Sequence, residues 1–79
     1  MDAINGITIE RYAELCAKMN DVIKDKDACI KIAASEGIRK VDWEAAHKIW
    51  QSIMTDPSDM GRTASAFEKS WHAALSTKN

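Results

Sequence analysis

Residues 8–23 read TIERYAELCAKMNDVI, and their pattern of apolar residues decides the fold class. Apolar side chains recur at steps of three and four residues, at Ile9, Tyr12, Cys16, Met19 and Ile23. Such spacing places side chains on one face of an α-helix, and charged residues fill the opposite face. Thr8 precedes the first of them and is a residue type that caps helix N-termini. The stretch therefore predicts an amphipathic helix over about residues 8–22.

Three later segments repeat this helical spacing, which predicts further helices over about residues 27–36, 42–55 and 57–75. Gly37 follows the first of them, where a glycine often ends a helix because it tolerates positive φ. Asp42 is expected to cap the next helix. Pro57 is expected in the first turn of the last helix, where its missing N–H costs no hydrogen bond. One continuous helix over residues 9–36 is the competing interpretation.

Four amphipathic helices with short connections predict an all-α fold, a compact antiparallel bundle. The length of 79 residues predicts a single domain over residues 1–79. A chain this short buries only about 60% of the surface that its unfolded form exposes. We therefore expect one small core and little room for a deep active-site cavity. The ends, residues 1–6 and 76–79, are expected to fray.

The charge balance limits the classes of partner. The chain carries 11 Lys and Arg against 12 Asp and Glu, interspersed along its length. This balance argues against a nucleic-acid partner, because such binders usually carry a basic excess or a basic stripe. No apolar run is long enough for a membrane helix, and the first residues lack the features of a signal peptide. We therefore expect a cytoplasmic protein with no membrane partner.

The cysteines and histidines show no motif of a chemical site. Cys16 and Cys29 are expected to be free, buried thiols in a reducing compartment. Together with His47 and His72 they have the residue types of a zinc site, but the successive gaps are 13, 18 and 25 positions. Structural zinc sites usually present their ligands in close pairs. Phosphate-binding, dinucleotide-binding and nucleophile-elbow motifs are missing as well. We expect no metal, no cofactor and no enzymatic activity.

One segment favours an alternative function. Ala33 and Gly37 have the spacing of a DNA-binding helix-turn-helix, in which the helix over residues 42–55 would contact the bases. The support from charge is thin, because Arg39 and Lys40 are the basic residues beside it. A small helix-turn-helix-like DNA-binding regulator is therefore kept as the alternative.

The large aromatic rings suggest a binding surface. The chain contains five of them, Tyr12, Trp43, Trp50, Phe67 and Trp71. A core of short helices shelters about two tryptophans, and a partly exposed third is a typical interface anchor. We expect Trp43, at the start of its helix, to be that anchor. Met54 and Met60 flank the turn before the last helix and would extend the patch with adaptable contacts.

The candidate protein-binding residues are thus Trp43, His47, Met54 and Met60, where His47 is expected to pack on the neighbouring aromatic rings at the edge of the core. These residues predict a small non-enzymatic protein-interaction module that presents an apolar, aromatic helix face. An adaptor, an accessory subunit and an immunity-type binding protein all fit this description. The partner is another protein, and a homodimer formed through the same patch is a variant of the hypothesis.

The chain also resembles a group of proteins. The run GITIERYAELCA over residues 6–17, the pair Asp42-Trp43, then Trp50 and the run MTDP over residues 54–57 resemble short bacterial all-helical proteins of unknown function. The likeness covers about residues 6–75, and its matched residues are mainly helix caps and core positions. It implies a shared helical fold and a bacterial source. That group has no assigned activity, so no functional residue carries over.

Overall fold

The computed structural model describes residues 3–77. Its four α-helices are α1 (Ile9–Lys18), α2 (Lys26–Ser35), α3 (Lys40–Thr55) and α4 (Arg62–Thr77). Two short 3-10 turns, η1 (Asn20–Val22) and η2 (Pro57–Asp59), lie in the connections. The described residues form no strand beyond one isolated bridge between Ile4 and Ile7. The all-α fold with four helices is therefore confirmed.

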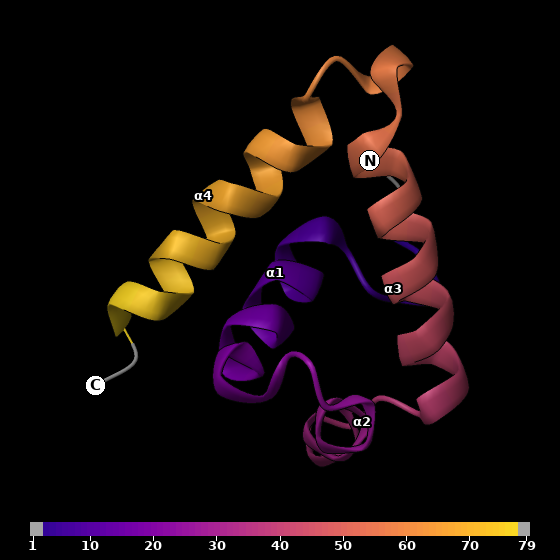
Figure 1. The fold of residues 1–79 in the computed structure, drawn as a ribbon, viewed down its shortest axis with the longest axis vertical. Coiled ribbons are helices and arrows are strands. Elements are labelled where there is room, and N and C mark those ends of the chain that lie inside the picture. The colour runs from indigo at the N-terminus through magenta and orange to yellow at the C-terminus, as the bar shows by residue number, and fades with distance from the viewer. Residues whose placement is uncertain (1–2, 78–79) are drawn as a thin grey trace.

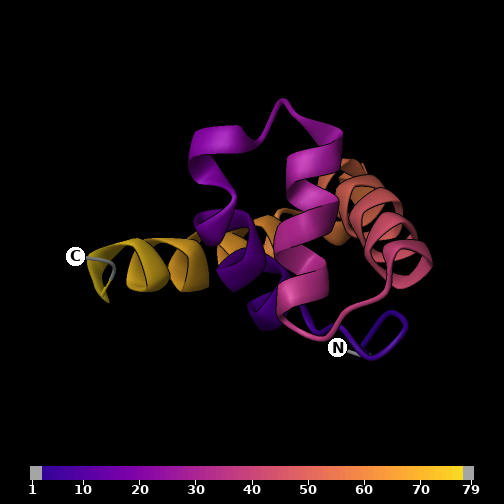
Figure 2. The ribbon, with the colours of Figure 1, turned by 90° about the horizontal axis from the view of Figure 1, so that it is seen from below.

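Helix α1 is the centre of the arrangement. It lies between α4 and α3 in Figure 1, contacts all three other helices, and packs most extensively against α4. Six of its ten residues are buried, which is too many for a single contact stripe, so its neighbours approach from different sides. Figure 1 shows α2 end-on, and Figure 2 shows α2 upright with α4 lying across the view. The helices therefore cross one another rather than share one bundle axis.

Local hydrogen bonds explain where the first two helices begin and end. Thr8 caps α1 as expected, because its hydroxyl accepts a hydrogen bond from the Arg11 N–H at 3.1 Å. Helix α1 ends at Lys18, and the chain then turns through η1. Asp25 caps α2, because its side chain accepts a hydrogen bond from the Ala28 N–H at 3.2 Å. The continuous helix over residues 9–36 is excluded by this break. The expected end of the first helix near residue 22 is replaced by the 3-10 turn.

Gly37 ends α2 as the sequence predicts. Its φ of +82° lies in the left-handed region, which glycine adopts at little cost. The Gly37 N–H donates to the Ala34 carbonyl at 3.0 Å, and the Ile38 N–H donates to the Ala33 carbonyl at 2.9 Å. This pair of bonds satisfies two carbonyls at the helix end and directs the chain toward α3.

The beginnings of α3 and α4 differ from expectation. Helix α3 begins at Lys40, so Asp42 lies inside its first turn and accepts from the Arg39 Nε at 2.9 Å instead of capping the helix. Pro57 opens η2 and not α4, because Met60 has a left-handed φ of +57° that interrupts the helical path. Asp59 then accepts hydrogen bonds from the N–H and hydroxyl of Thr63, each at 2.8 Å. Helix α4 therefore begins about five residues later than predicted.

The two ends have regular conformations over the residues that the structure describes. Ile4 and Ile7 exchange two backbone hydrogen bonds of 2.9 Å across a tight turn. Helix α4 continues through Ser76 to Thr77. The fraying expected for residues 3–6 and 76–77 stays a prediction. The parts of that expectation that concern residues 1–2 and 78–79 lie outside the described residues.

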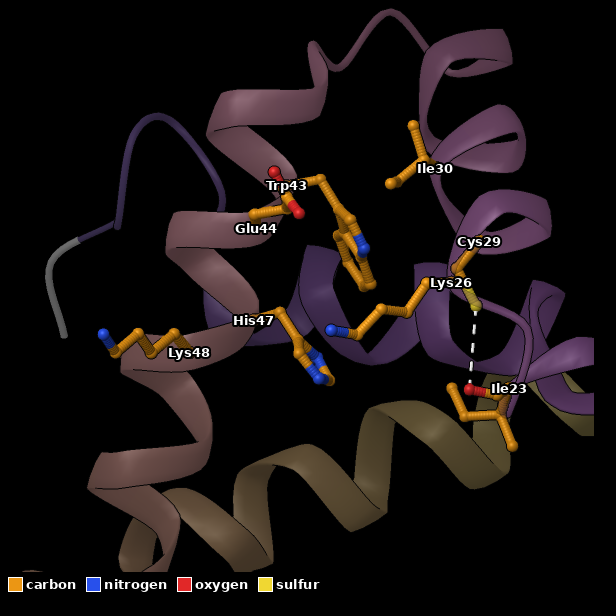
Figure 3. Close-up of a pocket in the computed structure, with 8 residues that line it drawn as sticks. All are labelled: Ile23, Lys26, Cys29, Ile30, Trp43, Glu44, His47 and Lys48. Carbon is orange, nitrogen blue, oxygen red and sulfur yellow. Dashed lines mark hydrogen bonds between the residues drawn. The ribbon is translucent and has the colours of Figure 1, made fainter.

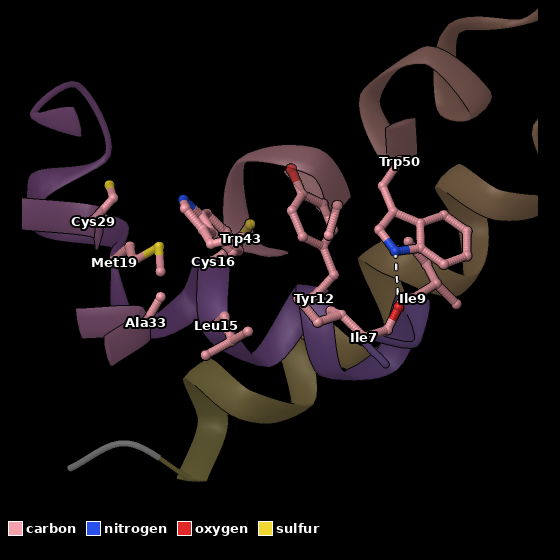
Figure 4. Close-up of a cluster of buried hydrophobic side chains, with 11 residues drawn as sticks. Ile7, Ile9, Tyr12, Leu15, Cys16, Met19, Cys29, Ala33, Trp43 and Trp50 are labelled. Atoms are coloured by element: carbon pink, nitrogen blue, oxygen red, sulfur yellow. Dashed lines mark hydrogen bonds between the residues drawn. The ribbon is translucent and has the colours of Figure 1, made fainter. Parts of the chain in front are cut away.

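The core forms where α1 meets the tryptophans of α3 (Figure 4). Tyr12, Leu15 and Met19 are fully buried, and Trp50 packs beside them. The Trp50 indole N–H donates at 3.1 Å to the Ile7 carbonyl, which also accepts from the Ile4 N–H. This bond fastens the N-terminal turn to α3. The cysteines at positions 16 and 29 are free and buried, as expected.

An ion-pair cluster joins the C-terminal end of α2 to helix α1. The Glu36 carboxylate accepts from the Lys18 Nζ at 2.8 Å and from an Arg11 guanidinium nitrogen at 3.0 Å. The hydrogen bond from Lys18 lowers the pKa of Glu36 below its ordinary value, and the bond from Arg11 contributes less. The folded state therefore favours the charged carboxylate. This preference stabilises the fold at pH values above the ordinary pKa of a glutamate, and the stabilisation is lost as the pH falls through the lowered pKa.

Replacing Glu36 tests this cluster. We expect Glu36→Gln to lower the urea midpoint of unfolding at pH 7, because the carboxylate is then lost from two basic groups. The difference from wild type should shrink as the pH falls through the lowered pKa of Glu36, because protonation removes the same charge. Glu44→Gln is the control, since Glu44 makes no ion pair with residues 3–77. An equal deficit at pH 7 and in acid would contradict the assignment.

Replacing Trp50 tests the bond to the N-terminal turn. Trp50→Phe removes the indole N–H and leaves a small void, so we expect a loss of about 1–3 kcal/mol in the free energy of unfolding. Trp71→Phe should cost less, because Trp71 is only partly buried. Urea denaturation followed by far-UV circular dichroism measures both. If the two variants lose equal stability, the bond does not have this role.

Candidate functional site

A pocket of about 230 Å³ opens between α2, α3 and the segment that joins α1 to α2 (Figure 3). We call it the α2–α3 pocket; it is lined by Ile23, Lys26, Cys29, Ile30, Trp43, Glu44, His47 and Lys48. Cys29 and Trp43 are buried and Ile30 is half-buried, so the interior of the pocket is apolar. The three charged lining residues are exposed, which places the charge at the rim. This division between interior and rim is typical of a recognition site.

A second hollow, of about 300 Å³, adjoins the first. We call it the aromatic pocket; its lining residues are Tyr12, Cys16, Asn20, Ile23, His47, Gln51, Phe67, Glu68 and Trp71. Three large rings and the His47 imidazole surround it. Ile23 and His47 line both hollows, and both side chains are exposed. These two residues therefore form the ridge between the pockets.

Hydrogen bonds fix the His47 ring at this ridge. The buried Tyr12 hydroxyl lies 2.8 Å from the His47 Nδ1 and accepts from the Gln51 amide nitrogen at 3.0 Å. The tautomer of the imidazole decides which of the two groups donates in the contact between the hydroxyl and Nδ1. The Trp43 ring stacks on the imidazole with centroids 5.5 Å apart. His47 is thus held in one orientation by Tyr12 and Trp43.

The electrostatic environment keeps the site uncharged at its centre. Desolvation of the partly buried ring lowers the pKa of His47, and the positive charge of Lys26 lowers it further, which favours the neutral imidazole. Burial raises the pKa of the Tyr12 phenol. The ridge and the buried wall of the aromatic pocket therefore offer hydrogen-bonding groups without net charge.

The thiols are in their protonated form at neutral pH. Burial raises the pKa of Cys16 to about 11. Burial also raises the pKa of Cys29, with a further contribution from the nearby Asp25 carboxylate. The Cys29 Sγ donates to the Val22 carbonyl at 3.4 Å. A thiolate, not a thiol, is the nucleophile and the metal ligand, so these groups contribute packing to the pockets rather than reactivity.

Residues 3–77 contain neither a cluster of metal ligands nor a membrane-spanning helix. No three His, Cys, Asp or Glu side chains in this part of the chain lie close enough together to hold a metal ion. Within the same residues, no helix combines the length and the apolar character needed to cross a membrane. The two pockets are therefore the candidate binding sites of the described residues.

The structure brings together two of the four predicted binding residues. Trp43 and His47 line the α2–α3 pocket, whereas Met54 and Met60 line neither hollow. Trp43 lies in the first turn of α3 and Met54 in the last, so the length of the helix separates them. Met60 is 79% exposed in the turn before α4, and Met54 packs partly against the core.

The expectation that Trp43 is the partly exposed tryptophan is wrong. Trp43 is only 4% exposed, because the Tyr12 ring packs against it at a centroid distance of 5.5 Å. The partly buried tryptophan is Trp71. Trp43 contributes to the α2–α3 pocket as a buried wall and not as a protruding anchor.

Sequence reasoning missed the residue that joins the pockets. Ile23 continues the apolar stripe of the first helix in the sequence, which predicts burial. The break at η1 turns it outward, and it is 48% exposed. The polar run from Lys24 to Asp27 was the signal of a turn, but it did not show that the turn begins before Ile23.

Removing the Tyr12 hydroxyl tests the hydrogen-bonded ridge. We expect Tyr12→Phe to shift the pKa of His47, because the imidazole loses its hydrogen-bond partner at Nδ1. The loss of stability should be about 1 kcal/mol for the lost hydrogen bond. Proton NMR titration of the imidazole signals measures the pKa, with the His72 signal as an internal reference. An unchanged His47 titration would show that the hydroxyl does not control the ring.

Comparison with known proteins adds no family to this geometry. No protein-family model, curated protein sequence or solved structure matches the chain. The resemblance to short bacterial helical proteins therefore remains a prediction from sequence.

Proposed function

We propose that the protein is a non-enzymatic protein-interaction module that binds a bulky apolar side chain of another protein in the α2–α3 pocket. The observation that carries the proposal is an apolar interior of about 230 Å³ surrounded by a charged rim. Pockets for drug-sized ligands and cofactors are usually larger, about 300–1,000 Å³. A pocket of this size fits a protruding side chain of a partner better than a nucleotide or a flavin.

The rim charges indicate what lies beside that side chain. Figure 3 shows Lys26 extending across the opening with Glu44 on the α3 side, whereas the Lys48 ammonium points away from the pocket. None of the three makes an ion pair with another residue between positions 3 and 77. The Lys26 ammonium over the opening favours a partner with a carboxylate next to the inserted apolar group, since complementary charges speed and orient association.

Trp43 and His47 support the proposal because they give the pocket a firm wall. The indole is buried and stacked on the imidazole, whose Nδ1 is hydrogen-bonded to Tyr12. A rigid aromatic surface loses little side-chain entropy when a partner binds. Interface residues of this kind contribute most of the binding energy in many complexes.

The biological setting belongs to the same proposal. Two free, buried thiols suit the reducing cytoplasm, and the sequence resemblance suggests a bacterial protein. An adaptor, an accessory subunit and an immunity-type protein would each use the pocket in this way. A homodimer is the variant in which the partner is a second copy.

One observation favours DNA binding as a second candidate. The helices α2 and α3 are joined at the left-handed Gly37, and Figure 1 shows α2 end-on while α3 lies in the plane, as in a helix-turn-helix. The charges favour it less, because Arg39 is engaged by Asp42. Salt-sensitive retention of the protein on duplex DNA, lost in Arg39→Glu/Lys40→Glu, would support this candidate over the first.

Selection from a displayed library of random peptides tests the proposed function. We expect enriched peptides to share a bulky apolar residue beside Asp or Glu. Affinity for a synthetic copy should fall at least about tenfold in Ile30→Glu, because a buried charge would occupy the pocket. Lys26→Glu should weaken binding by roughly two- to fivefold.

Matched controls keep this test specific. Val41→Glu places the same charge at a 61% exposed apolar residue of α3 that lines neither pocket. Lys31→Glu reverses an exposed lysine of α2 away from the opening. Equal binding to Ile30→Glu and Val41→Glu, or enriched peptides without an apolar residue, would overturn the proposal.

A further inference from the structure

We infer that the two pockets act as one groove that binds an amphipathic helix of a partner protein in a single direction. The acidic N-terminal turn of that helix lies over the α2–α3 pocket, and its basic C-terminal turn lies over the aromatic pocket. The inference rests on the proposed function and extends it from one inserted side chain to the shape, charge and direction of the partner segment.

The first step is the continuity of the two hollows. Ile23 and His47 line both, and both are exposed at the surface. Figure 3 shows α4 passing beside these two residues, on the side of the aromatic pocket. A partner that rests on this ridge reaches both hollows when it presents two apolar side chains on one face. An amphipathic helix does so with residues three, four or seven positions apart.

The second step is the wall of the aromatic pocket. The Tyr12 and Phe67 rings lie with centroids 5.6 Å apart, and Trp71 is partly buried beside them. Flat rings of this kind accept aliphatic side chains in several orientations. The aromatic pocket therefore receives the second apolar residue of the helix, while the α2–α3 pocket receives the first.

The third step is the difference in charge between the two ends. The Lys26 ammonium extends across the α2–α3 pocket (Figure 3), whereas Glu68 is the one charged residue that lines the aromatic pocket. These two opposite charges distinguish one pocket of the groove from the other. Helices that carry acidic residues in the first turn and basic residues in the last are favoured by the helix dipole. Such a helix matches the groove in one direction.

Two capped, alanine-rich peptides of about 16 residues are the probes. Both present leucines on one face. The first has glutamates in its first turn and lysines in its last, and the second has these charges exchanged. We expect wild-type protein to bind the first peptide about five- to tenfold more tightly by isothermal titration calorimetry. The charge-reversed variant Lys26→Glu/Glu68→Lys should prefer the second peptide, which separates the groove charges from any difference in peptide helicity.

Single variants separate this inference from the proposed function. Ile30→Glu and Trp71→Gln each alter one pocket. Each should weaken binding of the first peptide about tenfold, whereas Val41→Glu should leave its affinity unchanged. Loss in Ile30→Glu alone would overturn the groove and leave the proposed function standing. Unchanged binding in both would overturn both. If Trp71→Gln does not fold, the exposed variant Glu68→Lys replaces it, and it must weaken the first peptide.

Direction has its own readout. A nitroxide label on the N-terminus of the first peptide should broaden the amide signals of Lys26 and Ile30, and a label on its C-terminus should broaden those of Glu68 and Trp71. The opposite pattern, or a preference that fails to reverse in the charge-reversed variant, would overturn the proposed direction. If neither peptide binds the wild type, the groove inference fails and the peptide selection alone decides the proposed function.

Discussion

Tyr12 places a phenol where α1, α3 and α4 meet. Tyr12 has no exposed surface, and its ring lies within 6 Å, between centroids, of Trp43, His47 and Phe67. A buried hydroxyl without hydrogen-bond partners costs about 1–3 kcal/mol, so the fold must supply them. His47 and Gln51, one turn apart on α3, do so. This requirement sets the rotation of α3 against α1.

That rotation determines the chemical character of the surface. With His47 turned toward Tyr12, the preceding turn of α3 directs Trp43 into the core, where it also forms a wall of the α2–α3 pocket. The burial that gives this pocket an apolar interior also raises the pKa of the Cys29 thiol. One cause thus strengthens recognition of apolar groups and weakens thiol reactivity. The charges remain at the rim, where they orient a partner.

The sequence was sufficient where local chemistry decides the structure. The spacing of apolar residues, the Thr8 cap and the Gly37 turn predicted helices and two of their ends correctly. It failed where tertiary packing decides. A left-handed φ at Met60 has no sequence signature, so the beginning of α4 was misplaced. The burial of Trp43 depends on its packing against Tyr12, and a list of aromatic residues does not show that contact. The exposure of Ile23 depends on the break at η1, which the apolar stripe does not show.

The contact between α1 and α4 also matters while the chain is being made. Helix α1 is synthesised first but packs most extensively against α4, which is completed 59 residues later in the sequence, as the positions of Lys18 and Thr77 show. At ordinary translation speeds this interval lasts on the order of several seconds. During this interval the apolar face of α1 lacks its contacts with α4. The native contacts between α1 and α4 therefore form only after α4 has emerged from the ribosome.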